Sequence, residues 1–142
     1  MAHKDPYGNF NFRVEIDGIS RAAFQEASGL DSNIEVIEHC EGGDNITKYP
    51  GRVKYSNLQL KRGITDDLEL YKWHRQWLTG DPAAKRVNGS IVLFDRQGNE
   101  KARWNFTNGW PAKWTGPSLN AEGNDIAIES LEIAHEGLER VS

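Results

Sequence analysis

Apolar and polar residues alternate along most of this 142-residue chain, and this pattern constrains the fold more than any other feature. In FNFRVEIDG the apolar residues are Phe10, Phe12, Val14 and Ile16, each followed by a polar residue, and Gly18 ends the run. A period of two residues is typical of a β-strand that buries one face. The pattern therefore predicts a strand here and favours a fold built mainly from strands.

Five further segments have the composition and spacing of strands. Short turn-forming sequences separate some of them, and DRQGN is typical of a hairpin turn. Alternating strands joined by short turns favour antiparallel sheets, because parallel strands need long crossover connections. The predicted strands cover residues 34–39, 53–61, 89–95, 101–108 and 125–137.

The last predicted strand changes phase along its length. Ile126 and Ile128 would face one side of a sheet, whereas Leu131 and Ile133 would face the other. Such a change predicts a bulge or bend of the kind that lets a sheet turn a corner. The whole pattern predicts a mainly β fold with one α-helix, either a small antiparallel β-barrel or a barrel of two packed sheets.

One helix is expected, over residues 66–79. Asp66 followed by Glu69 resembles a capping box, and Gly80 followed by Asp-Pro is a typical helix end. Spacings of three and four residues place the apolar side chains of LELYKWHRQWL on one face, which we expect to cover the sheet. This packing face consists of Leu70, Trp73, His74, Trp77 and Leu78.

Charge and cysteine content argue against several classes of protein. The 17 basic and 21 acidic residues are mixed along the chain and give a net charge of −4, so no basic stripe indicates specific nucleic-acid recognition. Cys40 is the one cysteine, which rules out a disulfide within the chain. The N-terminal sequence lacks the apolar region of a secretory signal, so we expect synthesis and folding in the cytosol.

Residues 40–57 fit this scheme poorly. They predict a long, polar, Gly-rich loop between two strands, and loops of this length in small domains are usually functional or disordered. The segment carries charges of both signs together with Tyr49 and Tyr55, which is typical of a protein–protein contact. A mobile surface loop is the alternative interpretation.

No combination of residues predicts catalysis or metal binding. His39 and Cys40 form the one adjacent nitrogen and sulfur pair, whereas a structural zinc site needs four ligands in spaced pairs. The same two residues make a poor base and nucleophile, because neighbours on a strand point to opposite faces. His74 lies within the predicted packing face and is interpreted as a packed ring. We therefore predict no catalytic residue, no metal site and no cofactor.

Two classes of function, ligand binding and catalysis, stay open on these residues. Trp104, Trp110 and Trp114 could line a pocket in a small ligand-binding β-barrel. The second class is an enzyme that uses His39 or His74. A binding barrel would be a monomer of about 16 kDa, whereas a structural subunit would form rings or filaments.

Seven segments, in order, resemble the tail tube protein family of contractile phages, and in particular the branch that forms the inner tube of extracellular phage-tail-like contractile injection systems. No single segment is diagnostic, but seven in the same order are highly specific. They extend over about residues 5–140 and read DPYGNFNFRVEIDG, FQEASGLD, EVIEHCEGGDN, KYPGRVKYSNLQLKRGIT, LYKWHRQWL, GSIVLFDRQGNEKARWNFTNGWPAKWTGP and AIESLEIAHEGLE.

The resemblance implies a building block rather than an enzyme. Members of the family fold as a small β-barrel or paired sheets with one helix, as does the haemolysin-coregulated protein of type VI secretion. They form hexameric rings that stack head to tail into a hollow tube, and a surrounding contractile sheath drives the tube through a target membrane. For this chain the resemblance implies a single tail-tube domain over residues 1–142, with a stacking loop at about 40–57.

The resemblance also implies partners and contact residues. The chain would contact its own copies, the sheath protein, baseplate and spike proteins at one end of the tube, a cap or terminator at the other, and cargo protein or DNA in the lumen. It would be assembled in the bacterial cytoplasm and act in a released particle or a phage virion tail. The residues expected in the ring-stacking interface are Glu41, Asp44, Asn45, Lys48, Tyr49, Arg52 and Tyr55.

Overall fold

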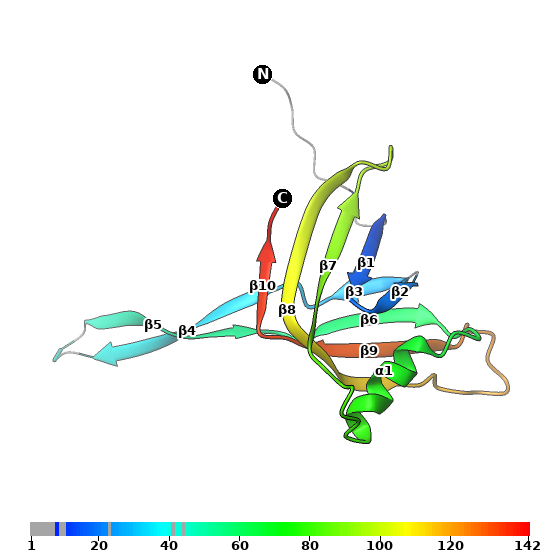
Figure 1. Ribbon diagram of the computed structural model, residues 1–142. Helices are drawn as coiled ribbons and strands as arrows, with labels where there is room; N and C mark the ends of the chain where they lie inside the picture. Colours follow the sequence, from blue (N-terminus) through cyan, green and yellow to red (C-terminus); the bar gives the residue numbers. More distant parts are fainter. Residues whose placement is uncertain (1–7, 9–10, 23, 41, 44) are drawn as a thin grey trace.

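The computed structural model describes residues 8, 11–22, 24–40, 42–43 and 45–142. Within these residues the chain forms strands that pair antiparallel throughout, together with one helix, as the sequence predicts (Figure 1). The elements in order are β1 (Phe12–Ile16), β2 (Ile19–Ala22), β3 (Glu26–Ser28), β4 (Ser32–Cys40), β5 (Ile46–Tyr55), β6 (Leu58–Gly63), α1 (Glu69–Leu78), β7 (Val87–Phe94), β8 (Glu100–Thr115), β9 (Ile128–Ala134) and β10 (Gly137–Arg140).

Two sheets share the long strand β8, which bends from one sheet into the other (Figure 1). The first half of β8 pairs with β7 and β10, and β7 in turn carries β1 and β2. The second half pairs with β9, which carries β6 and β3. We call these the first sheet and the second sheet. The predicted two-sheet arrangement is therefore confirmed.

The bend lies in β8 and not in the last long strand, where the sequence predicted it. Asn108 has a φ of 53° at the point where β8 passes between the sheets, and the register with β9 shifts again between Pro111 and Lys113. Strand β9 is regular, since it pairs with β6 without a shift. The apparent phase change arose because Ile128 is exposed while Glu129 is buried.

The core fills the space between the two sheets. Phe106 is 1% exposed and lies close to two glycines, because a Cβ on Gly89 would stand 2.4 Å from its ring and one on Gly109 would stand 2.6 Å away. The two glycines thus make room for the largest fully buried side chain of the core. The other members of this core cluster are Val14, Ile16, Leu58, Leu60, Leu70, Trp73, Ile91, Leu131 and Ile133.

The strand predicted over residues 53–61 is two strands, β5 and β6. The break falls at Ser56 and Asn57, where the chain enters the second sheet. The Ser56 amide donates to Asp31 Oδ1 at 3.3 Å, and the Ser56 carbonyl lies 3.0 Å from His135 Nε2. These contacts hold a short turn that an alternating pattern of side chains does not reveal.

Helix α1 begins later than predicted, and its N-cap residue is Leu68, which makes no side-chain capping hydrogen bond. The Glu69 amide instead donates to Asp67 Oδ1 at 2.9 Å, so Asp67 rather than Asp66 accepts a hydrogen bond from the first turn. The predicted end is confirmed. Gly80 has a φ of 68°, which a residue without a side chain adopts readily, and the Asp81 amide bonds to the Gln76 carbonyl at 2.9 Å.

Replacing Gly89 with Ala should destabilise the protein, because the new methyl group would overlap the Phe106 ring and the Glu15 carbonyl. Overpacking of this kind costs about 1–3 kcal/mol of unfolding free energy. Gly63→Ala is the matched control, since its Cβ would meet its nearest atoms at 3.7 Å. Thermal and denaturant unfolding of the two variants would measure the difference, and equal stabilities would contradict this account of the core.

Candidate assembly surfaces

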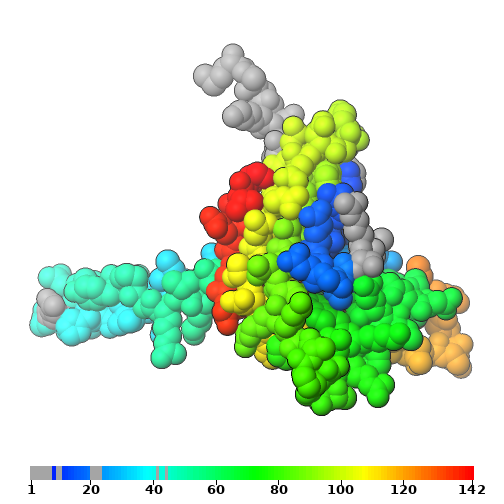
Figure 2. Space-filling model, viewed as in Figure 1, coloured from blue at the N-terminus to red at the C-terminus, as the bar shows by residue number. Residues whose placement is uncertain are grey.

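Strands β4 and β5 form a two-stranded ribbon that projects away from both sheets (Figures 1 and 2). We call this ribbon, residues 32–55, the arm. The prediction of a loop over residues 40–57 was wrong, because most of that segment is strand β5. Its side chains are exposed on both faces, so the residues do not follow the alternation that marks a half-buried strand.

The arm carries large apolar side chains that no described part of the chain covers. Each is close to half exposed or more, from 45% for Tyr49 to 59% for Val36. A lone two-stranded ribbon is marginally stable in water, because it buries little apolar area. The arm therefore has the character of a contact element that needs a partner. Its exposed apolar residues are Ile34, Val36, Ile37, Ile46, Tyr49 and Val53.

Most of the predicted stacking residues lie on the arm. Lys48 is opposite Glu38 and Tyr49 is opposite Ile37, while Arg52 lies where the register shifts. Tyr55 is at the base of the arm, where its ring centroid is 5.6 Å from that of His135. Asn45 immediately precedes β5, and Glu41 and Asp44 lie outside the described residues.

The prediction concentrated on polar residues and missed the aliphatic ones. Ile34, Val36 and Ile37 had been assigned to an ordinary strand, although β-branched residues in NIEVIEHC were visible as a signal. Strand β5 also has a marked charge. Lys48, Arg52 and Lys54 are its charged residues, so it carries three positive charges and no carboxylate.

A second exposed apolar surface surrounds the start of helix α1. It borders a cavity of about 360 Å³ whose lining includes Thr65, Trp114 and Glu129. The Ile64 amide bonds to the Ala127 carbonyl at 2.9 Å, which brings two distant segments of the chain together. We call this surface the helix-side patch. Its exposed apolar residues are Ile64, Leu68, Tyr71, Ile126 and Ile128, with exposed fractions from 36% to 72%.

A buried ion pair lies on the interior side of the helix-side patch. Arg62 and Glu129 are 6% and 4% exposed, and Arg62 Nε donates to Glu129 Oε1. Trp114 Nε1 donates to the other Glu129 oxygen at 3.0 Å, and Arg62 also lies 3.5 Å from the Asp67 carboxylate. Tyr71 meets the Trp114 ring edge-on at 5.0 Å. These contacts connect β6, β8 and β9 to the start of α1.

The predicted packing face of the helix is only partly correct. Leu70, Trp73 and His74 are buried, and Trp77 packs its ring 5.3 Å from that of Trp110. Leu78 is 66% exposed, so its assignment to this face was wrong. Leu78 lies in the last turn of α1, where the neighbouring Trp77 packs against Trp110 of β8.

Among the residues that the structure describes, the candidate chemical groups do not come together as a catalytic or ligand site. His74 Nδ1 lies 2.9 Å from the Pro111 carbonyl, which ties the helix to β8 and accounts for this buried ring. Trp104 and Trp114 line different cavities, while Trp110 packs against Trp77, so the three tryptophans do not share a pocket. Cys40 is exposed. Within the described residues no three His, Cys, Asp or Glu side chains gather as a metal site.

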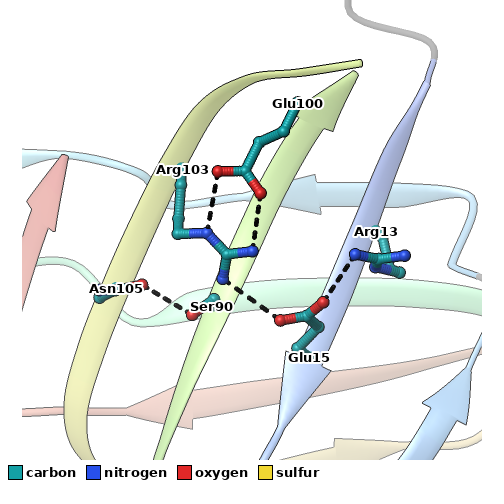
Figure 3. A network of polar contacts seen from close by, with 6 residues as sticks. All are labelled: Arg13, Glu15, Ser90, Glu100, Arg103 and Asn105. Carbon is teal, nitrogen blue, oxygen red and sulfur yellow. Dashed lines mark hydrogen bonds and ion pairs between the residues drawn. The ribbon is translucent and has the colours of Figure 1, made fainter. Parts of the chain in front are cut away.

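The outward face of the first sheet is polar and internally paired (Figure 3). Arg103 bonds to Glu100 at 2.8 Å and to Glu15 at 3.2 Å, and Glu15 also lies 2.8 Å from Arg13. The hydrogen bonds from Arg103 hold the pKa of Glu100 below its ordinary value. Positive and negative charges alternate across β1 and β8, so this face has little to gain from contact with an apolar partner.

No helix among the described residues is long and apolar enough to cross a membrane.

Residues 8–139 match the family described as T4-like virus tail tube protein gp19. The chain belongs to this tail tube family. The match covers both sheets, the helix and the arm, and it makes the protein a structural tube component rather than an enzyme. No curated protein matches the sequence significantly.

Solved structures agree with the family. A chain in the structure of the PVC extracellular contractile injection system, a sheath–tube complex in the extended state, is 25% identical with a TM-score of 0.83, covering 96% of this chain and 92% of that one. A chain in the structure of the anti-feeding prophage cap is 25% identical with a TM-score of 0.87, covering 100% and 95%. Hcp1 from Salmonella typhimurium shares the fold at 16% identity, with a TM-score of 0.58 and coverage of 91% and 90%.

Replacing Glu129 with Gln should destabilise this tail tube protein, because Arg62 would lose its closest counter-charge in a buried site. Breaking a buried pair in this way costs about 3–5 kcal/mol of unfolding free energy. The control is Glu26→Gln, which removes an exposed ion pair with Lys61 that spans 3.6 Å and should cost less than about 1 kcal/mol. Denaturant unfolding measures both, and a Glu129→Gln variant as stable as the control would contradict the role of the pair.

Proposed function

We propose that this chain forms hexameric rings that stack head to tail into the hollow inner tube of a contractile injection system or phage tail. The observation that carries the proposal is the arm, an uncovered ribbon with apolar side chains on a protein of the tail tube family. Copies of the same chain are the partners that a tube subunit meets most often. Their contact would cover the apolar area that the isolated chain exposes.

The sheet edges support sideways contacts within a ring. Among the described strands, β2, β3 and β10 each pair with a neighbour on one side only. Unpaired edges can form hydrogen bonds with another chain, and a closed ring removes them. We propose that ring contacts use these edges, while the arm with Lys48, Tyr49 and Arg52 extends to the next ring. Asn45 and Tyr55, together with Glu41 and Asp44, complete the proposed stacking set.

The polar face of Figure 3 is the proposed wall of the lumen. Its charges already pair with one another, so it can remain in contact with water, whereas the apolar arm and helix-side patch need to be covered. A wall with balanced charge suits the passage of cargo protein or DNA without sequence-specific recognition. Residues 1–142 would act as one tail-tube domain.

The remaining partners follow from the structures that this chain resembles, whose titles describe a sheath–tube complex, a baseplate and a tube-terminating cap. We propose a contractile sheath around the tube, baseplate and spike proteins at one end, and a cap or terminator at the other. Assembly would take place in the bacterial cytoplasm, and the tube would act in a released particle or virion, delivering cargo through a target membrane.

Electron microscopy and light scattering of the purified protein test this proposal directly. We expect ring-shaped particles with six-fold symmetry and, at higher concentration, hollow tubes. A sample that stays a monomer of about 16 kDa at every concentration would contradict a tube role.

Shortening the arm should separate ring formation from stacking. Ile34 and Val53 face each other across the ribbon, so residues 35–52 can be replaced by Asn-Gly, a sequence that closes two-residue hairpins. We expect rings to persist and tubes to disappear in electron micrographs, because the sheet edges stay intact. Long tubes built from the shortened protein would assign stacking to another surface.

A further inference from the structure

We infer that the arm of one copy docks on the helix-side patch of the copy in the next ring, with strand β5 facing the patch. The inference rests on the proposed stacking of rings and adds the surface that receives the arm. Most of the exposed large apolar side chains of the described chain belong to these two surfaces or to the segments next to them. Each surface therefore offers the kind of partner that the other needs.

Charge favours the same pairing. The arm presents Lys48, Arg52 and Lys54 along β5, without an acidic residue on that strand. The segments that border the patch, residues 64–67 and 116–127, contain acidic residues and no cation. Those acidic residues are Asp66, Asp67, Glu122 and Asp125.

Several charges on the two surfaces lack an ion-pair partner in the part of the chain that the structure describes. Among the described residues, Arg52 and Lys54 form no ion pair, and Asp66 and Asp125 form none either. Asp67 differs, because it lies 3.5 Å from Arg62. A contact between two copies would thus bring unpaired cations to unpaired carboxylates around an apolar centre, which is the usual arrangement of core and rim in protein interfaces.

The positions of the two surfaces exclude a contact within one molecule and favour a repeating one. The arm projects from one end of the second sheet, and the start of α1 with residues 116–127 lies at the other end (Figure 1). An arm therefore cannot reach the patch of its own chain. When two different surfaces of identical subunits pair in this way, each added copy offers a new free surface, and the assembly grows in one direction.

The cavity in the helix-side patch is a defined place where a side chain of the arm could bind. Tyr71, Trp114 and Glu129 form part of its lining, and Glu129 bonds to both Trp114 and the buried Arg62. Because these contacts lock the wall, the patch is ready to receive an apolar side chain without rearrangement. The arm would gain order on docking, whereas the patch would keep its structure.

Charge reversal on each surface tests the contact. The arm variant is Arg52→Glu with Lys54→Glu, and Lys48 stays because it faces Glu38 within the ribbon. The patch variant is Asp66→Lys with Asp125→Lys, and Asp67 stays because it pairs with Arg62. All four positions are exposed, so each variant should fold and form rings. We expect each variant alone to shorten mean tube length about tenfold, since it places like charges opposite each other.

Combining the changes should restore stacking in two ways. A chain that carries all four substitutions should build tubes of wild-type length, because both charges of each pair are exchanged. Separately formed rings of the arm variant and the patch variant should also build tubes when mixed, with the two kinds of ring alternating. Alternation follows because each variant carries the same sign of charge at the exchanged positions of its two surfaces, so it repels itself but attracts the other variant.

The control is Lys85→Glu with Lys113→Glu, which changes net charge as much as the arm variant but lies on neither surface. It should leave tube length unchanged. Wild-type tubes together with no rescue by the combined chain or by mixing would overturn the docking of the arm on this patch and leave the tube role intact. Failure of the wild-type protein to form tubes at all would overturn the proposed function and the docking with it.

Discussion

The uncovered arm is the feature on which the account of this protein depends. A two-stranded ribbon gains its hydrogen bonds from one neighbouring strand and buries almost nothing, so its stability has to come from other contacts. Ile34, Val36 and Val53 are each more than half exposed, although such residues are normally enriched in the interior. A protein that stayed alone would carry this area as an aggregation hazard. In a tail tube protein the same area is available for contacts that repeat along the tube.

The rest of the fold supplies a rigid base for the arm and for the surface at the opposite end. Strand β8 belongs to both sheets and so fixes them to each other. At the base of the arm, Ser56 is held by Asp31 and His135. At the far end of the second sheet Arg62, paired with Glu129, holds the segment just before the helix. The two surfaces therefore keep a defined relation to each other, as stacking in a regular tube requires.

Sequence reasoning recovered the parts of the fold that bury one face of an element. The alternation in β1, the turn between β7 and β8 and the helix end at Gly80 were all visible, because periodicity and turn residues report directly on them. The same reasoning failed where burial does not alternate. Strand β5 of the arm looked like a loop because both of its faces are exposed. Strand β9 seemed to bend because Glu129 occupies an interior position that its partner Arg62 makes tolerable.

The helix-side patch could not be found from sequence for a different reason. It joins residues 64–71 with residues 126–128, and no local pattern shows that these segments meet. The exposed aliphatic residues of the arm were individually visible but looked like the interior residues of an ordinary strand. Their meaning depends on the absence of a covering layer within the described chain, which only the three-dimensional arrangement reveals.

Hydrogen–deuterium exchange of the arm amides in isolated subunits and in assembled tubes tests the central claim most directly. We expect fast exchange across β4 and β5 in the isolated subunit, strong protection of the same amides in tubes, and similar protection of β8 and β9 in both states. Arm amides that exchange equally fast in the tube and in the isolated subunit would contradict it, because assembly would then leave the ribbon uncovered.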